Sequence, residues 1–195
     1  MRQHRTDSSI GVPPAGAALQ GVRVIEMGQL IAGPFCGKTL GEFGADVIKI
    51  EAPEGGDPLR SWRLVKEGTS VWWQVQSRNK RSLALDLRQP QGQEIARLLI
   101  AEADVLIENF RPGTLESWGM SPDEIHALNP GLVILRISGY GQTGPYRDLP
   151  GFGAIGERHP VADIAFGLEP AGLDQREQCR RSNLHKRPRE ELVCP

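Results

Sequence analysis

The chain has 195 residues, which is enough for one ordinary domain with a hydrophobic core and too few for two comfortable ones. Its 23 basic and 24 acidic residues nearly cancel, so a net charge of -1 gives no field that would hold a nucleic acid or an anionic membrane surface. The composition therefore predicts neither partner.

The amino-terminal residues 1–18 include basic side chains but no apolar core of signal-peptide length, and no apolar run is long enough to span a bilayer. We interpret this segment as a flexible leader. Three cysteines, Cys36, Cys179 and Cys194, lie far apart without metal-ligand spacing, so no metal site is predicted. This cysteine usage fits a reducing cytoplasm.

Two short apolar runs rich in β-branched residues, 22–27 and 46–51, predict strands. Between them, the helical spacing of Phe35, Leu40 and Phe43 predicts a helix. Strand, loop, helix and strand thus fit into about thirty residues, the size of a βαβ unit.

The alternation continues along the chain. A glycine- and proline-rich stretch at 52–62 predicts a loop, and Pro90 sits where a helix often starts, with Ile95, Leu98 and Leu99 on one helical face. The remaining predicted elements are strands at 82–87, 104–110 and 132–138, a helix at 91–102, and one or two short helices within 115–128, with a capped start at 121–124. Alternating strands and helices predict the α/β class with a Rossmann-like, doubly wound, mostly parallel sheet.

Gly139, Gly141 and Gly144 match the GxGxxG pattern of dinucleotide sites. That pattern works when the glycine turn leads directly into a helix, whose amino-terminal amides hold the pyrophosphate. Here Pro145 and Pro150 leave little room for a helix, so a nicotinamide or flavin enzyme is the less favoured alternative. A glycine-rich turn at the carboxyl end of a strand remains a place where open α/β sheets bind ligands.

After Glu157 the alternation stops, and residues 158–195 are rich in arginine and poor in apolar runs. We predict a disordered or aberrant tail there. The predicted organisation is a leader at 1–18, one incomplete Rossmann-like domain at 19–157, and this tail.

Four stretches, in order and at consistent spacing, resemble the class III CoA-transferase family, also called the CaiB/BaiF family. They are residues 19–60, 77–87, 103–120 and 128–152. The resemblance implies a large Rossmann-like domain that binds CoA, a smaller second domain, and a homodimer of interlocked chains. Because members of the family are longer, the chain corresponds to their amino-terminal half.

By resemblance, three segments contact CoA. Their residues are Ile31 and Ala32, then Leu85, Asp86, Leu87 and Arg88, then Asn109, Phe110 and Arg111. The chemistry suits this: amides that precede a helix can face a phosphate or a thioester oxygen, Phe110 can stack on adenine, and arginines, including those of residues 78–81, can grip phosphates. The structural alternatives are a turn that only shapes the chain, a core Phe110 and an exposed Arg111.

The family reaction implied by the resemblance moves CoA from an acyl-CoA to a carboxylic acid, so CoA is a substrate and no permanently bound cofactor is expected. An Asp carboxylate attacks the thioester carbonyl and forms a mixed anhydride. Asp163, within residues 160–168, matches the family's nucleophile, although the glycine-rich segment that should precede it is missing. Three alternatives stay open: an inactive CoA-binding fragment, an inactive partner-binding fragment, and an α-methylacyl-CoA racemase-like member. Phe152 stands where racemases carry a His, which favours transfer.

Overall fold

The structure is a computed structural model that describes residues 16–149 and residue 151. The tail predicted at 158–195 and most of the leader predicted at 1–18 lie outside the described residues. The elements are β1 (Arg23–Glu26), α1 (Ala32–Glu42), β2 (Asp46–Glu51), the 3-10 helix η1 (Pro58–Ser61), β3 (Val65–Lys66), β4 (Thr69–Ser70), α2 (Val71–Gln76), β5 (Lys80–Ala84), α3 (Pro90–Ala101), β6 (Val105–Glu108), α4 (Thr114–Ser117), α5 (Pro122–Leu128) and β7 (Val133–Arg136).

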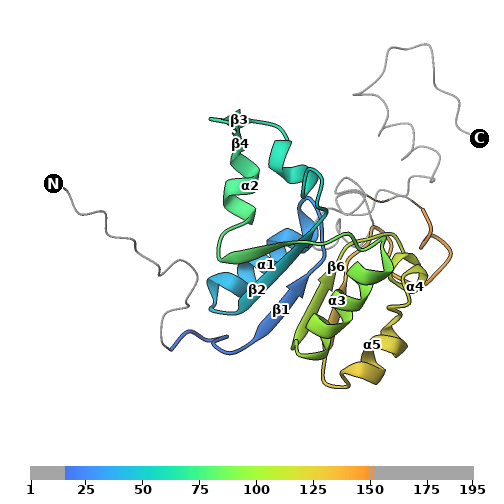
Figure 1. The fold of residues 1–195 in the computed structure, drawn as a ribbon. Helices are drawn as coiled ribbons and strands as arrows, with labels where there is room; N and C mark the ends of the chain where they lie inside the picture. The colour runs from blue at the N-terminus through green and yellow to red at the C-terminus, as the bar shows by residue number, and fades with distance from the viewer. Residues whose placement is uncertain (1–15, 150, 152–195) are drawn as a thin grey trace, which may run out of the picture. The chain divides into compact units, whose positions relative to one another are not determined.

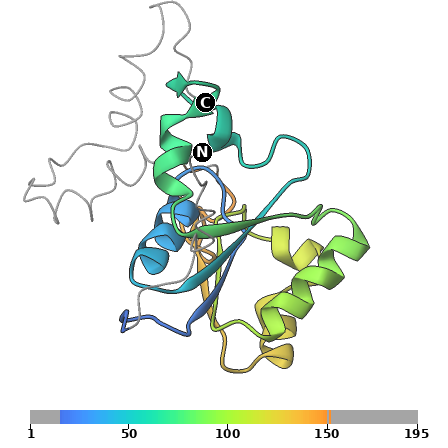
Figure 2. The ribbon, with the colours of Figure 1, turned by 60° about the vertical axis from the view of Figure 1, so that its left-hand side comes forward.

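Five of these strands form one parallel sheet in the order β5-β2-β1-β6-β7. Helices α1 and α2 lie on one side of it, and α3, α4 and α5 lie on the other (Figures 1 and 2). A separate antiparallel pair, β3 and β4, leads into α2. The strand order confirms the predicted α/β, Rossmann-like fold, and the direction of winding reverses between β1 and β6.

The helix predicted from Phe35, Leu40 and Phe43 is confirmed as α1, and of these three residues only Leu40 packs against the core. Phe35 and Phe43 are 54% and 58% exposed, and the buried positions include Gly33, Gly37 and Gly41. A Cβ atom at Gly37 would collide with the carboxylate of Glu26 on β1. The helix therefore approaches the sheet through a stripe of glycines, for which hydropathy gives no signal.

Helix α3 repeats this arrangement. It buries Gly92, Ala96 and Ile100, spaced four residues apart, whereas Ile95 and Leu98 are exposed and Leu99 is half-buried. The predicted start at Pro90 is confirmed, and of the predicted apolar face only Leu99 packs against the core. Gly92 is required because a Cβ there would collide with the carbonyl oxygen of Asp86, in the backbone that leads into the helix.

Substitution Gly92→Ala is expected to lower the free energy of unfolding by about 1–3 kcal/mol. The new Cβ would collide with the carbonyl oxygen of Asp86, and this overpacking outweighs the gain of roughly 1 kcal/mol in helix propensity. Urea unfolding followed by circular dichroism measures the change. Gly131→Ala is the matched control, because its Cβ would approach no described atom closer than 3.8 Å. Equal stability of the two variants would contradict the close contact.

Other boundaries differ modestly from the prediction. The strand predicted at 82–87 is β5, which runs from Lys80 to Ala84, because its partner β2 ends at Glu51 and the ladder stops there. The capped helix start is confirmed: the Ser121 hydroxyl accepts a hydrogen bond from the Glu124 amide, and the Glu124 carboxylate accepts one from the Ser121 amide. The β3–β4 pair and α2 were not predicted.

Candidate functional site

The residues predicted to contact CoA follow the carboxyl ends of three strands. Ile31 and Ala32 follow β1, residues 85–88 follow β5, and residues 109–111 follow β6. Because all five strands of the main sheet run parallel, these segments share one edge of that sheet, on both sides of the reversal between β1 and β6. Ligands bind at this place in open α/β sheets. Asp163 lies outside the described residues.

Residues 28–34, here called the loop, comprise most of the connection after β1 and the first turn of α1, and this segment is closed tightly on itself. Gly28 and Gly33 approach so closely that a Cβ on Gly28 would lie 2.7 Å from the Cα of Gly33. Leu30 adopts a left-handed backbone with φ of 59°. A non-glycine residue keeps that conformation only when its surroundings hold it there, so contacts with its neighbours fix the backbone conformation of this loop.

Asn109 holds this loop from the neighbouring strand. Its Oδ1 accepts a hydrogen bond of 2.6 Å from the amide of Gln29, and its Nδ2 donates one of 2.9 Å to the carbonyl of Gln29. Both polar groups of the side chain are therefore engaged with the loop. In this structure Asn109 links the segments after β1 and β6 across the reversal of the sheet.

The start of α1 carries no side-chain cap. Ile31 occupies the cap position and Ala32 the first helical position, and neither supplies an oxygen to the first-turn amides. Ile31 is half-buried and Ala32 is exposed. An uncapped helix start with an exposed first residue can receive an anion such as a phosphate, because its amides and the helix dipole favour negative charge.

The segment after β5 contains a local ion pair. Arg88 donates to Asp86 through its backbone amide and its guanidinium, at 3.0 and 2.9 Å, and these hydrogen bonds lower the pKa of the Asp86 carboxyl. Leu87 belongs to the hydrophobic core and Leu85 packs against it. The side chains that this segment offers to a ligand are thus Asp86 and Arg88.

The segment after β6 also contains one residue that packs against the core and one that is open to a ligand. Phe110 packs edge-on against Trp118, with ring centroids 5.3 Å apart, and lies against the core while remaining partly exposed. Arg111 is exposed, and among the described residues no carboxylate pairs with it. Arg111 is therefore available for an anionic ligand.

The cations of residues 78–81 are engaged within the chain. Arg78 pairs with Glu42, Lys80 with Glu26, and Arg81 with Asp46. Each has a carboxylate partner, as Arg88 has in Asp86, but Lys80 is buried whereas the side chains of Arg78 and Arg81 are exposed. Among these three cations, Lys80 is therefore the one whose charge is committed to a buried pair.

A pocket of about 260 Å³ lies beside the ends of β6 and β7 and is lined by Glu116, Arg136, Gln142 and Arg147, among others. Arg136 bridges two carboxylates, donating to Glu108 and to Glu116 at 2.7 Å each. Burial raises the pKa of Glu108 against the effect of Arg136, whereas the hydrogen bond from Arg136 lowers the pKa of Glu116. The charges that line this pocket are therefore largely balanced.

The glycine-rich stretch after β7 contains turns. Gly141 and Gly144 have positive φ angles of 80° and 91°, and residues 139–149 form bends and turns without a helix. The dinucleotide motif thus lacks the helix that gives it function, as its two prolines predicted.

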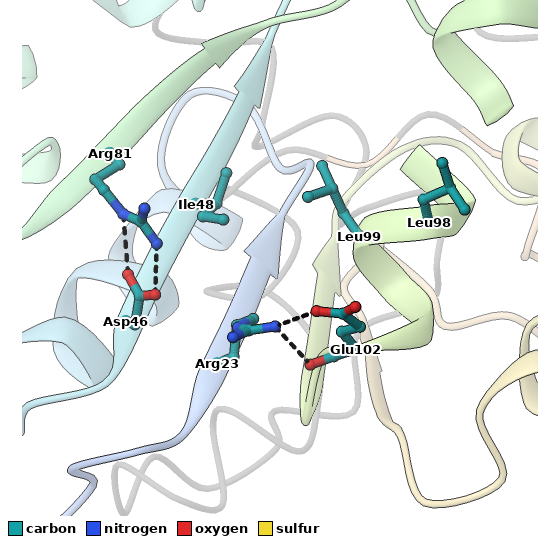
Figure 3. A pocket seen from close by; sticks show the side chains of 7 residues that line it. All are labelled: Arg23, Asp46, Ile48, Arg81, Leu98, Leu99 and Glu102. Carbon is teal, nitrogen blue, oxygen red and sulfur yellow. Dashed lines mark hydrogen bonds and ion pairs between the residues drawn. The ribbon is translucent and has the colours of Figure 1, made fainter. Parts of the chain in front are cut away.

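A second pocket, of about 380 Å³, opens at the amino ends of the strands (Figure 3). Ion pairs of Arg23 with Glu102 and of Arg81 with Asp46 flank it, and Ile48 on β2 faces the leucines of α3 across it. Because it lies at the edge opposite the loops described above, we do not assign it to the predicted ligand. Among the residues that the structure describes, no helix is long and apolar enough to cross a membrane, and no cluster of three potential metal ligands occurs.

Comparison with known proteins identifies the family. The sequence pattern of CoA-transferase family III matches residues 19–160, so the chain belongs to this family. It is similar to succinyl-CoA--D-citramalate CoA-transferase from Chloroflexus aurantiacus, with 56% identity over 140 residues covering 71% of this chain and 35% of that protein. The succinyl-CoA--L-malate CoA-transferase beta subunit from the same species is 53% identical over 149 residues, which cover 76% of this chain and 36% of the relative.

Solved structures agree. A CAIB/BAIF family protein from Brucella suis matches with a TM-score of 0.68 and 40% identity, covering 72% of this chain and 38% of that one. The chain spans about a third of the length of the curated relatives that it matches.

Proposed function

We propose that the carboxyl edge of the sheet binds the CoA part of an acyl-CoA, and that the protein transfers CoA from this donor to a carboxylic acid. The observation that carries the proposal is the convergence of the loops after β1, β5 and β6 at one edge, with the uncapped start of α1 among them. Arg88 and Arg111 are exposed on the two flanking loops. Guanidinium groups and helix amides are the groups that bind phosphate anions.

For the donor we propose succinyl-CoA, and for the acceptor a dicarboxylic acid. Relatives that share half or more of their aligned residues with this chain are named as succinyl-CoA transferases acting with D-citramalate or L-malate. More distant relatives are named for glutarate. A succinyl donor is the feature that the names of the malate, citramalate and human glutarate enzymes share.

For the chemical step we propose Asp163 as the nucleophile. Its carboxylate oxygen attacks the thioester carbonyl, the carbon–sulfur bond breaks, and a mixed anhydride and CoA thiolate result. Backbone amides at the edge of the sheet support this step by stabilising the oxyanion. Assembly as a homodimer and a cytoplasmic location remain predictions; two relatives are named as alpha and beta subunits of one transferase.

The test is CoA exchange. The chain is incubated with succinyl-CoA and a panel of dicarboxylic acids, and new acyl-CoA species are detected by mass spectrometry. We expect transfer to at least one acid and its loss, by a factor on the order of 10³ or more, in Asp163→Asn. Asp123→Asn, which changes an exposed carboxylate in α5, is the matched control and should transfer at the wild-type rate.

The other candidates give different outcomes. If the chain binds CoA but exchanges none, it is a CoA-binding protein without transferase activity. If it removes the α-proton of 2-methylacyl-CoA without transferring CoA, it is a racemase. If the chain binds NAD(H) and not CoA, the GxGxxG motif is a dinucleotide site and the proposed function is wrong.

A further inference from the structure

Four charged side chains are buried directly beneath the loop of residues 28–34, and none of them belongs to the residues that the family resemblance assigns. They are Glu26, Lys49, Asp57 and Lys80, each at most 2% exposed. Lys49 pairs with Glu26 at 2.9 Å and with Asp57 at 2.8 Å. Lys80 pairs with Glu26 at 2.6 Å, so two cations and two anions form one neutral cluster.

This cluster holds the loop at three points. Lys49 Nζ donates to the carbonyl of Gly28 at 2.6 Å, and Lys80 Nζ donates to the carbonyl of Pro34 at 2.7 Å. Asp57 Oδ1 accepts from the amide of the left-handed Leu30 at 3.1 Å. The first, third and last residues of the loop are therefore each bonded to a buried charge.

Stability alone is a weak reason for such a cluster. Buried ion pairs lose much of their attraction to desolvation, and apolar side chains of similar volume often stabilise a protein as well or better. Burial lowers the pKa of Lys80, and the Glu26 carboxylate opposes that shift. Apolar side chains, however, cannot bond the two loop carbonyls, so the particular contribution of the lysines is the geometry of the loop.

We propose that Lys49 and Lys80 are positioning residues that fix the backbone of residues 28–34 in the shape that presents Ile31 and Ala32 to CoA. The proposal rests on the proposed function, because it takes CoA as the ligand of this loop. On this proposal the buried cluster increases the affinity for CoA and takes no part in the chemical step. Loss of one anchor should weaken CoA binding and raise KM while leaving kcat nearly unchanged.

The experiment separates anchoring from charge balance at Lys80. Lys80→Met removes the bond to Pro34 and leaves one buried carboxylate in excess. The double variant Glu26→Gln/Lys80→Met restores the balance, since Lys49 and Asp57 remain paired, but does not restore the anchor. Lys66→Met, at an exposed position in β3, is the control.

CoA affinity is measured by calorimetry well below each variant's unfolding temperature. We expect both Lys80 variants to bind CoA more weakly by on the order of tenfold, although the double variant recovers stability. Hydrogen exchange should be faster in the loop and unchanged in β6. Recovery of affinity together with stability in the double variant would overturn the proposal, since only the charge balance would then matter.

Failure of the proposed function gives a different result. If the wild-type chain binds no CoA, the assignment of the ligand is wrong, and hydrogen exchange still tests the anchoring. Unchanged exchange at residues 28–34 in both Lys80 variants would overturn the anchoring itself.

Discussion

Substitution Lys49→Met is expected to lower the free energy of unfolding by about 3–5 kcal/mol. Lys49 is the centre of the buried cluster, because its ammonium contacts the carboxylates of both Glu26 and Asp57. Methionine keeps the apolar stem but leaves Asp57 buried without a cation, and the carbonyl of Gly28 loses its donor. Breaking a buried pair costs far more than removing an exposed one, because the remaining charge has no water to solvate it.

Urea unfolding of the chain at pH 7, followed by circular dichroism, measures this loss. Lys66→Met, which removes an exposed lysine, should change stability by less than about 0.5 kcal/mol. The double variant Lys49→Met/Asp57→Asn should recover a large part of the loss. It removes one charge of each sign, and the asparagine oxygen can still accept from the amides of Leu30 and Leu59. If Lys49→Met is as stable as the wild type, the lysine is not the buried partner of these carboxylates.

The sheet could be predicted from the sequence because parallel strands buried on both faces appear as short apolar runs. The helix faces could not, since glycine stripes carry no hydropathic signal. Gly37 is required by a contact with Glu26, eleven positions earlier in the chain, and that contact exists only after α1 folds back on β1. Of the three apolar residues whose spacing predicted α1, Phe35 and Phe43 are exposed and Leu40 packs against the core.

The meeting of the three loops could be predicted from the sequence, whereas their contact with CoA stays a prediction. The strand pattern and the resemblance indicated which loops meet, because the carboxyl ends of parallel strands share one edge. The buried charges beneath them were missed, since a Glu or Lys at a strand end is usually solvated. A signal was nevertheless present: Glu26 lies opposite Lys49 in the β1–β2 register, and Glu108 lies opposite Arg136 in the β6–β7 register. Opposite charges at matching positions of neighbouring strands predict such pairs once the strand order is known.

The second large effect that we expect is an acid-dependent loss of stability at Glu51. This carboxylate, 3% exposed at the end of β2, accepts hydrogen bonds from the Arg60 guanidinium, the Ser82 hydroxyl and the Asp57 amide. Burial by itself would raise its pKa. The bonds from Arg60, Ser82 and the Asp57 amide outweigh burial and lower the pKa to about 2.

The sign of the pH dependence follows from that shift. A carboxyl whose pKa is lower in the folded chain than in the unfolded chain stabilises the fold above its unfolded pKa, and this contribution is lost as the pH falls toward the folded pKa. The window therefore runs from about pH 4.5 down to about pH 2. We expect Glu51→Gln to lose about 2–3 kcal/mol at pH 7, somewhat less than the full shift implies, since Arg60 is partly exposed.

Wild type and Glu51→Gln are compared by urea unfolding at a series of pH values from 7 to 3. Their difference in stability should be constant above about pH 5 and roughly halved at pH 3. In that range the unfolded wild-type chain binds a proton at Glu51, which favours unfolding, and glutamine binds none. Taking the difference removes the titration of the other carboxyls, which both proteins share. Glu102→Gln is the control, because an exposed pair such as that of Glu102 with Arg23 contributes little stability. A difference at Glu51 that stays constant down to pH 3 would mean that packing, not the charge held by Arg60, is what the substitution removes.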